Sequence, residues 1–174
     1  MKLTRLSVYD IALISVFVAV IAVCSLITIP LAVPFTMQIF GVFLAIGLLG
    51  TKRAVICITA YLLLGMVGAP VFSSFQGGVQ VLFGQTGGFL MGFVLSALLS
   101  GELIKRVGGK FVLIFLSMLA GLLACYLCGI LWLVLVFSFD FSVAVIVCAP
   151  LIVFDVVKIA LASVLSMRLR KFVR

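Results

Sequence analysis

Long apolar stretches, separated by short polar or charged segments, follow one another along almost the whole chain. A helix of about 20 apolar residues crosses the roughly 30 Å hydrocarbon core of a bilayer. We therefore expect six membrane helices, over residues 8–29, 39–50, 53–69, 86–104, 111–139 and 150–167. The stretch 39–50 is too short to span as a straight helix, and 142–149 could form a short helix of its own. Pro150 is placed at the start of the last helix because proline has no backbone N–H to donate.

The composition makes lipid the solvent for most of this chain. Hydrophobic residues make up 67% of it and charged residues 9%, and the mean hydropathy is +1.57. A soluble domain with so few polar residues could not cover its exterior. No linker rich in serine, glycine or proline divides the sequence. We predict one all-α integral membrane domain over residues 1–174.

The basic residues assign the two sides of the membrane. Of the 12 lysines and arginines, all but Lys158 fall on one side of a six-helix topology, and the loops 30–38, 70–85 and 139–149 contain none. The positive-inside rule therefore places both termini in the cytoplasm. The basic residues form small clusters at helix ends, which indicates contact with anionic lipid headgroups rather than nucleic-acid binding. These residues are Lys2, Arg5, Lys52, Arg53, Lys105, Arg106, Lys110, Arg168, Arg170, Lys171 and Arg174.

The uncharged side has a polar character of its own. All the side-chain amides of the chain lie there, since it has no asparagine and its glutamines are Gln38, Gln76, Gln80 and Gln85. The segment 70–88 mixes glycine, amides, hydroxyls and phenylalanine. Irregular backbone at membrane depth is tolerated where it is buried in protein or lines a cavity. We interpret this segment as a loop that folds back and lines a pocket; an ordinary outer loop is the alternative.

Asp155 and Lys158 are the main candidates for chemistry inside the membrane. At positions i and i+3 of a helix they share a face and can neutralise each other. Lys158 lies about 15 Å from Arg168 along the helix, near mid-membrane. A charged residue there costs roughly 2.5–3.5 kcal/mol on insertion. The pair either binds a polar ligand or is a structural ion pair; a proton relay would lack a second intramembrane carboxylate. Charge favours Lys158 as the contact for a ligand carboxylate, with another polar end of the ligand as the open alternative.

Two predicted helices carry small residues at helical spacing, which lets helices approach closely. On the fourth helix, where we expect internal packing, these residues are Gly88, Gly92, Ser96 and Ser100. On the first helix they are Ser15, Ala19 and Ala22. The stripe on the first helix could pack internally or dock a partner protein, and the sequence leaves both open.

Several absences argue against enzyme activity. The chain has no histidine, only four acidic residues and no GxxxxGK[ST] phosphate loop. Metal-dependent, histidine-based and ATP-hydrolysing chemistry therefore lack their usual residues, and we predict no catalytic residue, metal or cofactor. The five cysteines all fall in apolar runs, where we interpret them as free thiols acting as small hydrophobes.

Four short motifs occur in order along the chain: Val33-Pro-Phe-Thr-Met-Gln38, Gly68-Ala-Pro-Val-Phe72 with Phe75-Gln-Gly-Gly78, Gly84-Gln-Thr-Gly-Gly-Phe-Leu-Met-Gly-Phe93, and Phe154-Asp-Val-Val-Lys158. Together they resemble the BioY family, the biotin-binding S components of energy-coupling factor (ECF) transporters, over essentially the whole chain. The resemblance implies a subunit of a prokaryotic cytoplasmic membrane that captures biotin from outside. It also implies partners: a transmembrane T component and two ATPases that drive uptake.

The resemblance also implies roles for particular residues. The substrate-binding residues would be Ser74, Gln76, Phe89, Asp155 and Lys158. The lid would hold Thr36 and Gln38, and the docking face for the T component would hold Ser15, Ala19 and Ala22. The usual proline and tyrosine of the third motif are Gln85 and Phe89 here, and a usual Pro-Gly is Val153-Phe154. These departures concern loop geometry and affinity. An S component for another small vitamin, or a structural or assembly subunit, is the alternative function.

Overall fold

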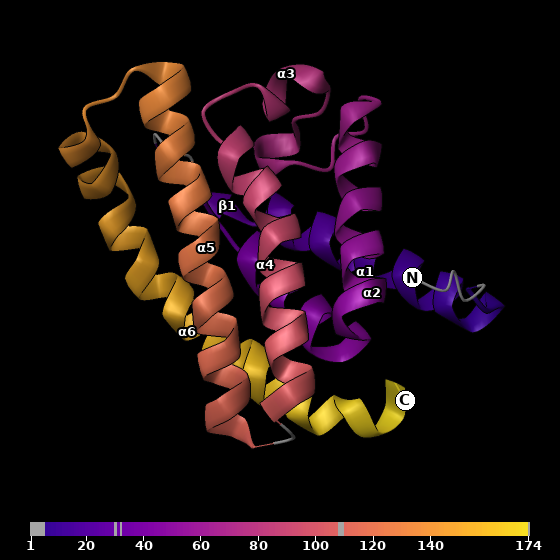
Figure 1. Ribbon diagram of the computed structural model, residues 1–174. Helices are drawn as coiled ribbons and strands as arrows, with labels where there is room; N and C mark the ends of the chain where they lie inside the picture. Colours follow the sequence, from indigo (N-terminus) through magenta and orange to yellow (C-terminus); the bar gives the residue numbers. More distant parts are fainter. Residues whose placement is uncertain (1–5, 30, 32, 108–109, 174) are drawn as a thin grey trace.

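The computed structural model describes residues 6–29, 31, 33–107 and 110–173 and is almost entirely helical, as predicted (Figure 1). Five of its helices are long and apolar enough to cross a membrane. The elements are α1 (Val8–Leu26), β1 (Thr28–Ile29), β2 (Phe35–Thr36), α2 (Gln38–Met66), the 3-10 helix η1 (Ser73–Phe75), α3 (Val79–Leu82), α4 (Gly87–Val107), α5 (Phe111–Phe137) and α6 (Phe141–Val173).

The predicted helices 39–50 and 53–69 are the two arms of α2, which is broken at Gly50. This residue has φ +74° and ψ 170°, a conformation that glycine adopts and L side chains rarely do. The last carbonyls of the first arm lose their helical donors at such a break. Arg170 of α6 supplies a replacement, since its Nε donates to the carbonyl of Gly47 at 2.9 Å. The break thus places two short apolar segments where one long helix would otherwise run straight.

The prediction for the start of the last helix was wrong. Pro150 lies inside α6, which begins at Phe141, so 142–149 belongs to α6 and is not a helix of its own. Proline removes one backbone hydrogen bond, but the apolar run continues on both sides of it, and the helix continues through. The C-terminal part of α6 crosses below the other helices, where Arg170 reaches the break in α2 (Figure 1).

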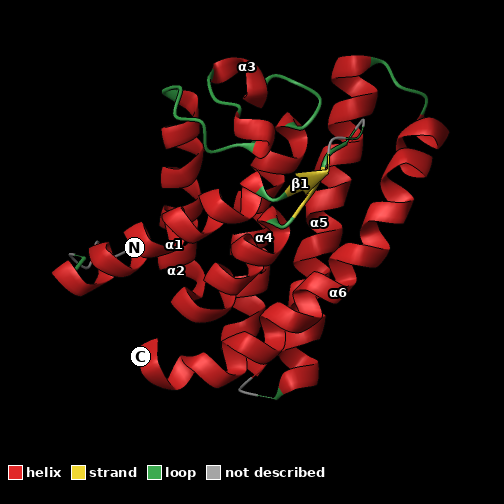
Figure 2. Ribbon diagram, turned by 180° about the vertical axis from the view of Figure 1, so that it is seen from behind, coloured by secondary structure: helices red, strands yellow, loops and turns green. Residues whose placement is uncertain are grey.

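Helices α4 and α5 stand side by side, and α2 packs against α1, α4 and α6 (Figures 1 and 2). The predicted packing stripe on α4 is confirmed as the contact with α5. A Cβ atom at Gly92 would lie 3.0 Å from the Cα of Cys125, so the two backbones nearly touch. The hydroxyl of Ser96 donates across the interface to the carbonyl of Gly121 at 2.7 Å. α1 contributes less to this core, because only Ile14, Phe17, Ile21 and Ser25 of its residues are buried.

The described basic residues other than Lys158 lie near the break in α2, at the C-terminal end of α4, at the start of α5 and in the C-terminal part of α6, and these parts of the chain lie toward the lower end of the bundle in Figure 1. Arg53, just after the break in α2, forms an ion pair with Asp10 of α1 at 2.6 Å. The remaining residues of this group are Lys52, Lys105, Arg106, Lys110, Arg168, Arg170 and Lys171. Lys2, Arg5 and Arg174 lie outside the described residues. The grouping agrees with the predicted sidedness, and the cytoplasmic location of this end stays a prediction.

Candidate ligand-binding site

A small β-hairpin between α1 and α2 lies among the helices of the bundle (Figure 2). β1 and β2 are antiparallel, with Thr28 opposite Thr36 and Ile29 opposite Phe35 (Figure 2). The ring of Phe35 packs edge-on against Phe154 of α6, with the ring centroids 5.4 Å apart. The hairpin therefore bridges from α1 to α6. This segment holds Thr36 and leads into Gln38, the two residues that the family resemblance assigns to a lid.

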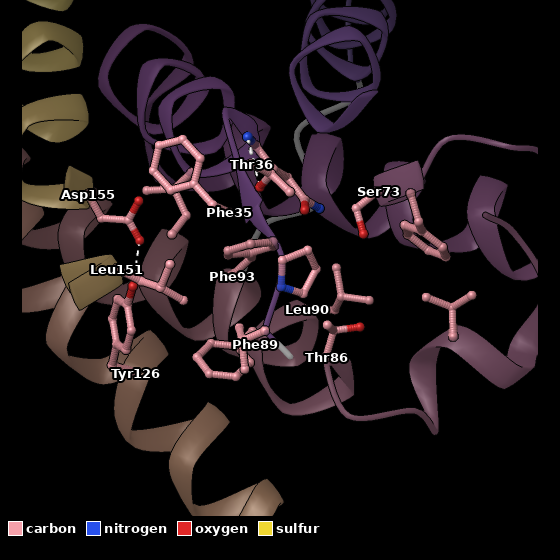
Figure 3. Close-up of a pocket in the computed structure, with 16 residues that line it drawn as sticks. Phe35, Thr36, Ser73, Thr86, Phe89, Leu90, Phe93, Tyr126, Leu151 and Asp155 are labelled. Carbon is pink, nitrogen blue, oxygen red and sulfur yellow. Dashed lines mark hydrogen bonds between the residues drawn. The ribbon is translucent and has the colours of Figure 1, made fainter. Parts of the chain in front are cut away.

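Beneath the hairpin lies a cavity, which we call the inner cavity. Its walls come from the hairpin and from α2, η1, α3, α4, α5 and α6 (Figure 3). The polar residues of its wall are Thr36, Gln38, Ser73, Thr86, Tyr126 and Asp155. The aromatic ones are Phe35, Phe72, Phe89, Phe93 and, by its ring, Tyr126. Both proposed lid residues, Thr36 and Gln38, are buried at this wall, as is the predicted substrate contact Phe89.

The polar and apolar groups follow one another along the cavity. Asp155 and Tyr126 lie at one end, and Ser73 and Thr86 lie at the other (Figure 3). The rings of Phe89 and Phe93 lie between the two ends, and Leu90 lies beside Thr86 (Figure 3). Gln38 is fixed at the wall because its Nε2 donates to the hydroxyl of Tyr61 at 2.9 Å. A ligand that fits this order has a polar head, an apolar body and a second polar end.

The acidic end of the cavity is a three-residue network. Lys158 and Asp155 form the ion pair that their spacing predicts, with Nζ 2.7 Å from Oδ1. Their exposed fractions are only 5% and 3%. The hydroxyl of Tyr126 on α5 donates to the other carboxylate oxygen, Oδ2, at 2.6 Å. A carboxylate offers about four lone-pair positions, so Asp155 retains acceptor capacity for a ligand.

Lys158 itself lies behind this wall. The described residues that line the inner cavity include Asp155, Phe35 and Thr36, and they do not include Lys158. Its ammonium donates to the backbone carbonyl of Thr36 at 2.6 Å as well as to Asp155. It also lies 3.8 Å from the centroid of the Phe35 ring, a cation–π contact. The lysine therefore joins the hairpin to α6. The charged group that faces the cavity is the carboxylate of Asp155, which the lysine holds in place.

A second, open hollow lies next to the inner cavity, and we call it the outer vestibule. It shares Pro34, Ser73, Val81 and Thr86 with the inner cavity. The remaining residues of its wall are Leu31, Ser74, Gln76, Gly77, Gln80, Gly84 and Gln85. The structure places the predicted substrate contacts Ser74 and Gln76 in the wall of the vestibule, whereas Asp155 lines the inner cavity. The irregular segment 70–88 does line a pocket, as its composition indicated.

Sequence reasoning missed Tyr126. It lies within the apolar run 111–139, where a buried tyrosine reads as an ordinary packing residue. The one available signal was a hydroxyl in the middle of that run, because buried tyrosine hydroxyls need a hydrogen-bond partner. Its ring packs edge-on against Phe89, 5.7 Å between centroids, so α4 and α5 hold it in place. Its partner on α6 could not be known before the helices were packed.

The predicted docking stripe lies on the less covered face of α1. Ser15 and Ala19 are exposed and Ala22 is half-buried. Exposed apolar neighbours on the same helix include Ile11, Val16 and Val23. The face is therefore open to lipid or to a partner protein.

Comparison with known proteins decides the family. A sequence model of the BioY family matches residues 1–174. The chain belongs to the BioY family. It is 40% identical over 158 residues to the biotin transporter BioY of Thermotoga maritima, covering 90% of this chain and 92% of the relative. It is 35% identical over 162 residues to a probable biotin transporter BioY of Pyrococcus horikoshii, covering 92% and 96%.

The fold agrees with this membership. A crystal structure of the S-component for biotin from an ECF-type ABC transporter superimposes with a TM-score of 0.89. It is 26% identical in sequence and the match covers 94% of this chain and 92% of that one. The resemblance that the four motifs indicated is confirmed, and with it the all-helical architecture of an S component.

Proposed function

We propose that this protein is the substrate-capture S component of an ECF-type transporter and binds biotin in the inner cavity. The observation that carries the proposal is the acidic network of Asp155, Lys158 and Tyr126 at one end of an aromatic cavity (Figure 3). It occurs in a fold that matches an S-component for biotin. The network is complementary to a head group that donates hydrogen bonds, and biotin has one in its ureido ring.

The chemistry of the cavity suits each part of the ligand. Asp155 accepts a hydrogen bond from a ureido N–H, and the charge on the carboxylate makes that bond stronger than a neutral one. Phe35, Phe89 and Phe93 surround the thioether ring, where burial of apolar area and sulfur–aromatic contacts both stabilise the complex. The pocket is thus mostly apolar with a few placed polar groups, as small-molecule sites usually are.

In this proposal Lys158 positions groups and does not bind the ligand carboxylate. Its ammonium is engaged by Asp155, by the carbonyl of Thr36 and by the face of Phe35. It balances the charge of Asp155, which would otherwise be a buried unpaired carboxylate. It also holds the hairpin, and with it Thr36 and Gln38, over the cavity as a lid.

Transport requires partners that this chain does not supply. We propose that it lies in the cytoplasmic membrane of a prokaryote with both termini inside, and is not an enzyme. A transmembrane T component would dock on α1 at Ser15, Ala19 and Ala22, and two ATPases would supply the energy. The support is the exposure of Ser15 and Ala19 and the names of the relatives, which are transporters.

The test is ligand-induced thermal stabilisation of the purified full-length chain in detergent. A ligand at 100 times its dissociation constant stabilises the folded state by about 2.7 kcal/mol. We expect biotin to raise the melting temperature, and thiamine, riboflavin and pantothenate at equal concentration to leave it unchanged. No shift with biotin would refute the proposed substrate, and a shift with another vitamin would redirect it.

A further inference from the structure

We propose that the carboxylate end of the ligand points out of the inner cavity toward the outer vestibule. From this it follows that the protein also binds biotin whose carboxyl group is joined to an amine. This inference rests on the proposed function and specifies the class of substrate more closely. The class would be biotin and its carboxamides, including conjugates with an amino acid.

Charge at the inner end of the cavity determines the orientation. The ionised group on the wall there is Asp155, and a ligand carboxylate beside it would meet a like charge in a buried site. Lys158 cannot offset this, because its ammonium is taken up by Asp155, by the carbonyl of Thr36 and by the ring of Phe35. A neutral head group with N–H donors fits this end, so the ureido ring lies inward.

The outer end offers neutral hydrogen-bonding groups. Ser73 and Thr86 lie at the end of the cavity opposite Asp155, where they also form part of the vestibule wall (Figure 3). The other polar side chains of the vestibule are Ser74, Gln76, Gln80 and Gln85, and none of the described residues that line it is ionisable. Hydroxyls and amides can donate to a carboxylate oxygen or to an amide oxygen alike. The site therefore places no requirement for charge on the end of the tail.

The vestibule also leaves room for an extension. The two spaces share Pro34, Ser73, Val81 and Thr86, so a chain that passes these residues leaves the inner cavity for the vestibule. Ser74, Gln76, Gln80 and Gln85 are all exposed, which makes this hollow open to the outside. A group attached beyond the carboxyl carbon would enter this open space and not a packed wall. Recognition is then strict for the ring system and tolerant for the tail.

The first experiment compares ligands on the purified full-length chain by calorimetry. The set is biotin, biotinamide, biotin joined through its carboxyl to the side chain of lysine, and biotin methylated on a ureido nitrogen. We expect the dissociation constants of the two carboxamides to lie within about tenfold of that of biotin. Their neutral amide group replaces the carboxylate at a place open to water, where water can complete its hydrogen bonds. The methylated ligand should bind with at least about 100-fold lower affinity, because the buried carboxylate of Asp155 loses the N–H that it would accept from.

The outcomes separate this inference from the proposed function. If biotin itself does not bind, the proposed function fails. If biotin binds and both carboxamides bind with more than about 100-fold lower affinity, the outward orientation of the ligand carboxylate is overturned and the proposed function stands.

A charge introduced in the vestibule tests the orientation directly. Gln85 is exposed, so its substitution should not affect folding. We expect Gln85→Lys to strengthen biotin binding about three- to tenfold and Gln85→Glu to weaken it similarly, with biotinamide unaffected by both. Ser142→Lys is the matched control, because Ser142 is exposed and lines neither the inner cavity nor the vestibule. It should leave the affinity for both ligands unchanged. Equal responses of biotin and biotinamide to Gln85→Lys would overturn the inference.

Discussion

The ammonium of Lys158 donates a hydrogen bond to the backbone carbonyl of Thr36 at 2.6 Å, across 122 positions of the chain. The same ammonium forms the ion pair with Asp155 at 2.7 Å. One side chain thus holds the hairpin over the inner cavity and fixes the carboxylate that faces it. The position of the hairpin and the position of the Asp155 carboxylate therefore both depend on Lys158, which does not itself line the cavity.

We expect the removal of one charge of the ion pair to destabilise the protein more than the removal of both charges. Lys158→Met leaves a buried carboxylate without its cation and should cost about 3–5 kcal/mol of stability. The double variant Asp155→Asn with Lys158→Met removes both charges and keeps an oxygen that can accept from Tyr126. It should recover most of the melting temperature while biotin affinity stays at least about tenfold weaker. Melting in detergent and calorimetry measure the two effects, and a double variant with normal affinity would show that the pair is only structural.

Tyr126→Phe should weaken biotin binding while the protein stays folded. The variant removes the hydroxyl that orients Asp155 and keeps the ring that packs on Phe89. A hydrogen bond to a charged group contributes about 1.5–3 kcal/mol, so the affinity should fall roughly 10- to 150-fold. Tyr9→Phe is the control, because Tyr9 is exposed and lines neither the inner cavity nor the vestibule. Calorimetry should show the loss of affinity at Tyr126 and none at Tyr9; an equal or larger loss at Tyr9 would mean that the network is not the head-group site.

Gly88→Ala should disturb the contact between α4 and α5. A Cβ atom there would lie 2.2 Å from the Cβ of Trp132 and 2.8 Å from the carbonyl oxygen of Cys128, so α5 has to shift. Overpacking of this kind costs about 1–3 kcal/mol, and Gly88→Val should cost more. Trp132 is the single tryptophan of the chain, so its fluorescence emission reports the change directly. Unchanged emission and melting in both variants would contradict the close packing.

Ala19→Leu should separate transport from binding, if the T component docks on α1 as proposed. Ala19 is exposed, so the larger side chain disturbs the docking face and not the bundle. Biotin binding by the purified chain should be unchanged, while uptake by cells that hold the partner subunits should fall at least about tenfold, because small residues permit the close approach of helices. Ala149→Leu, at an exposed alanine of α6, is the control and should leave uptake normal. Normal uptake with Ala19→Leu would place the docking surface elsewhere.

The predictions from sequence succeeded where the pattern is local. The apolar runs identify the helices, the spacing of Asp155 and Lys158 places them on one face, and the small residues of α4 mark its contact with α5. Each of these follows from helical periodicity along one segment. The misplaced start of the last helix shows the limit, because a proline inside a long apolar run can either begin a helix or lie within it.

The sequence by itself determined that the chain is helical and apolar enough to cross a membrane, with Asp155 and Lys158 on one face of its last helix, because hydrophobic runs and residue spacing are properties of neighbouring residues. The tertiary structure alone decided what surrounds that pair. It brought Tyr126 from α5 to Asp155, set Thr36 and Phe35 on Lys158, and placed Ser74 and Gln76 in the vestibule. These contacts join residues far apart in the chain, and no local pattern encodes them. The physical reason is that an ammonium buried in lipid-facing protein takes whichever acceptors the fold brings within reach, here a carboxylate, a hairpin carbonyl and an aromatic face.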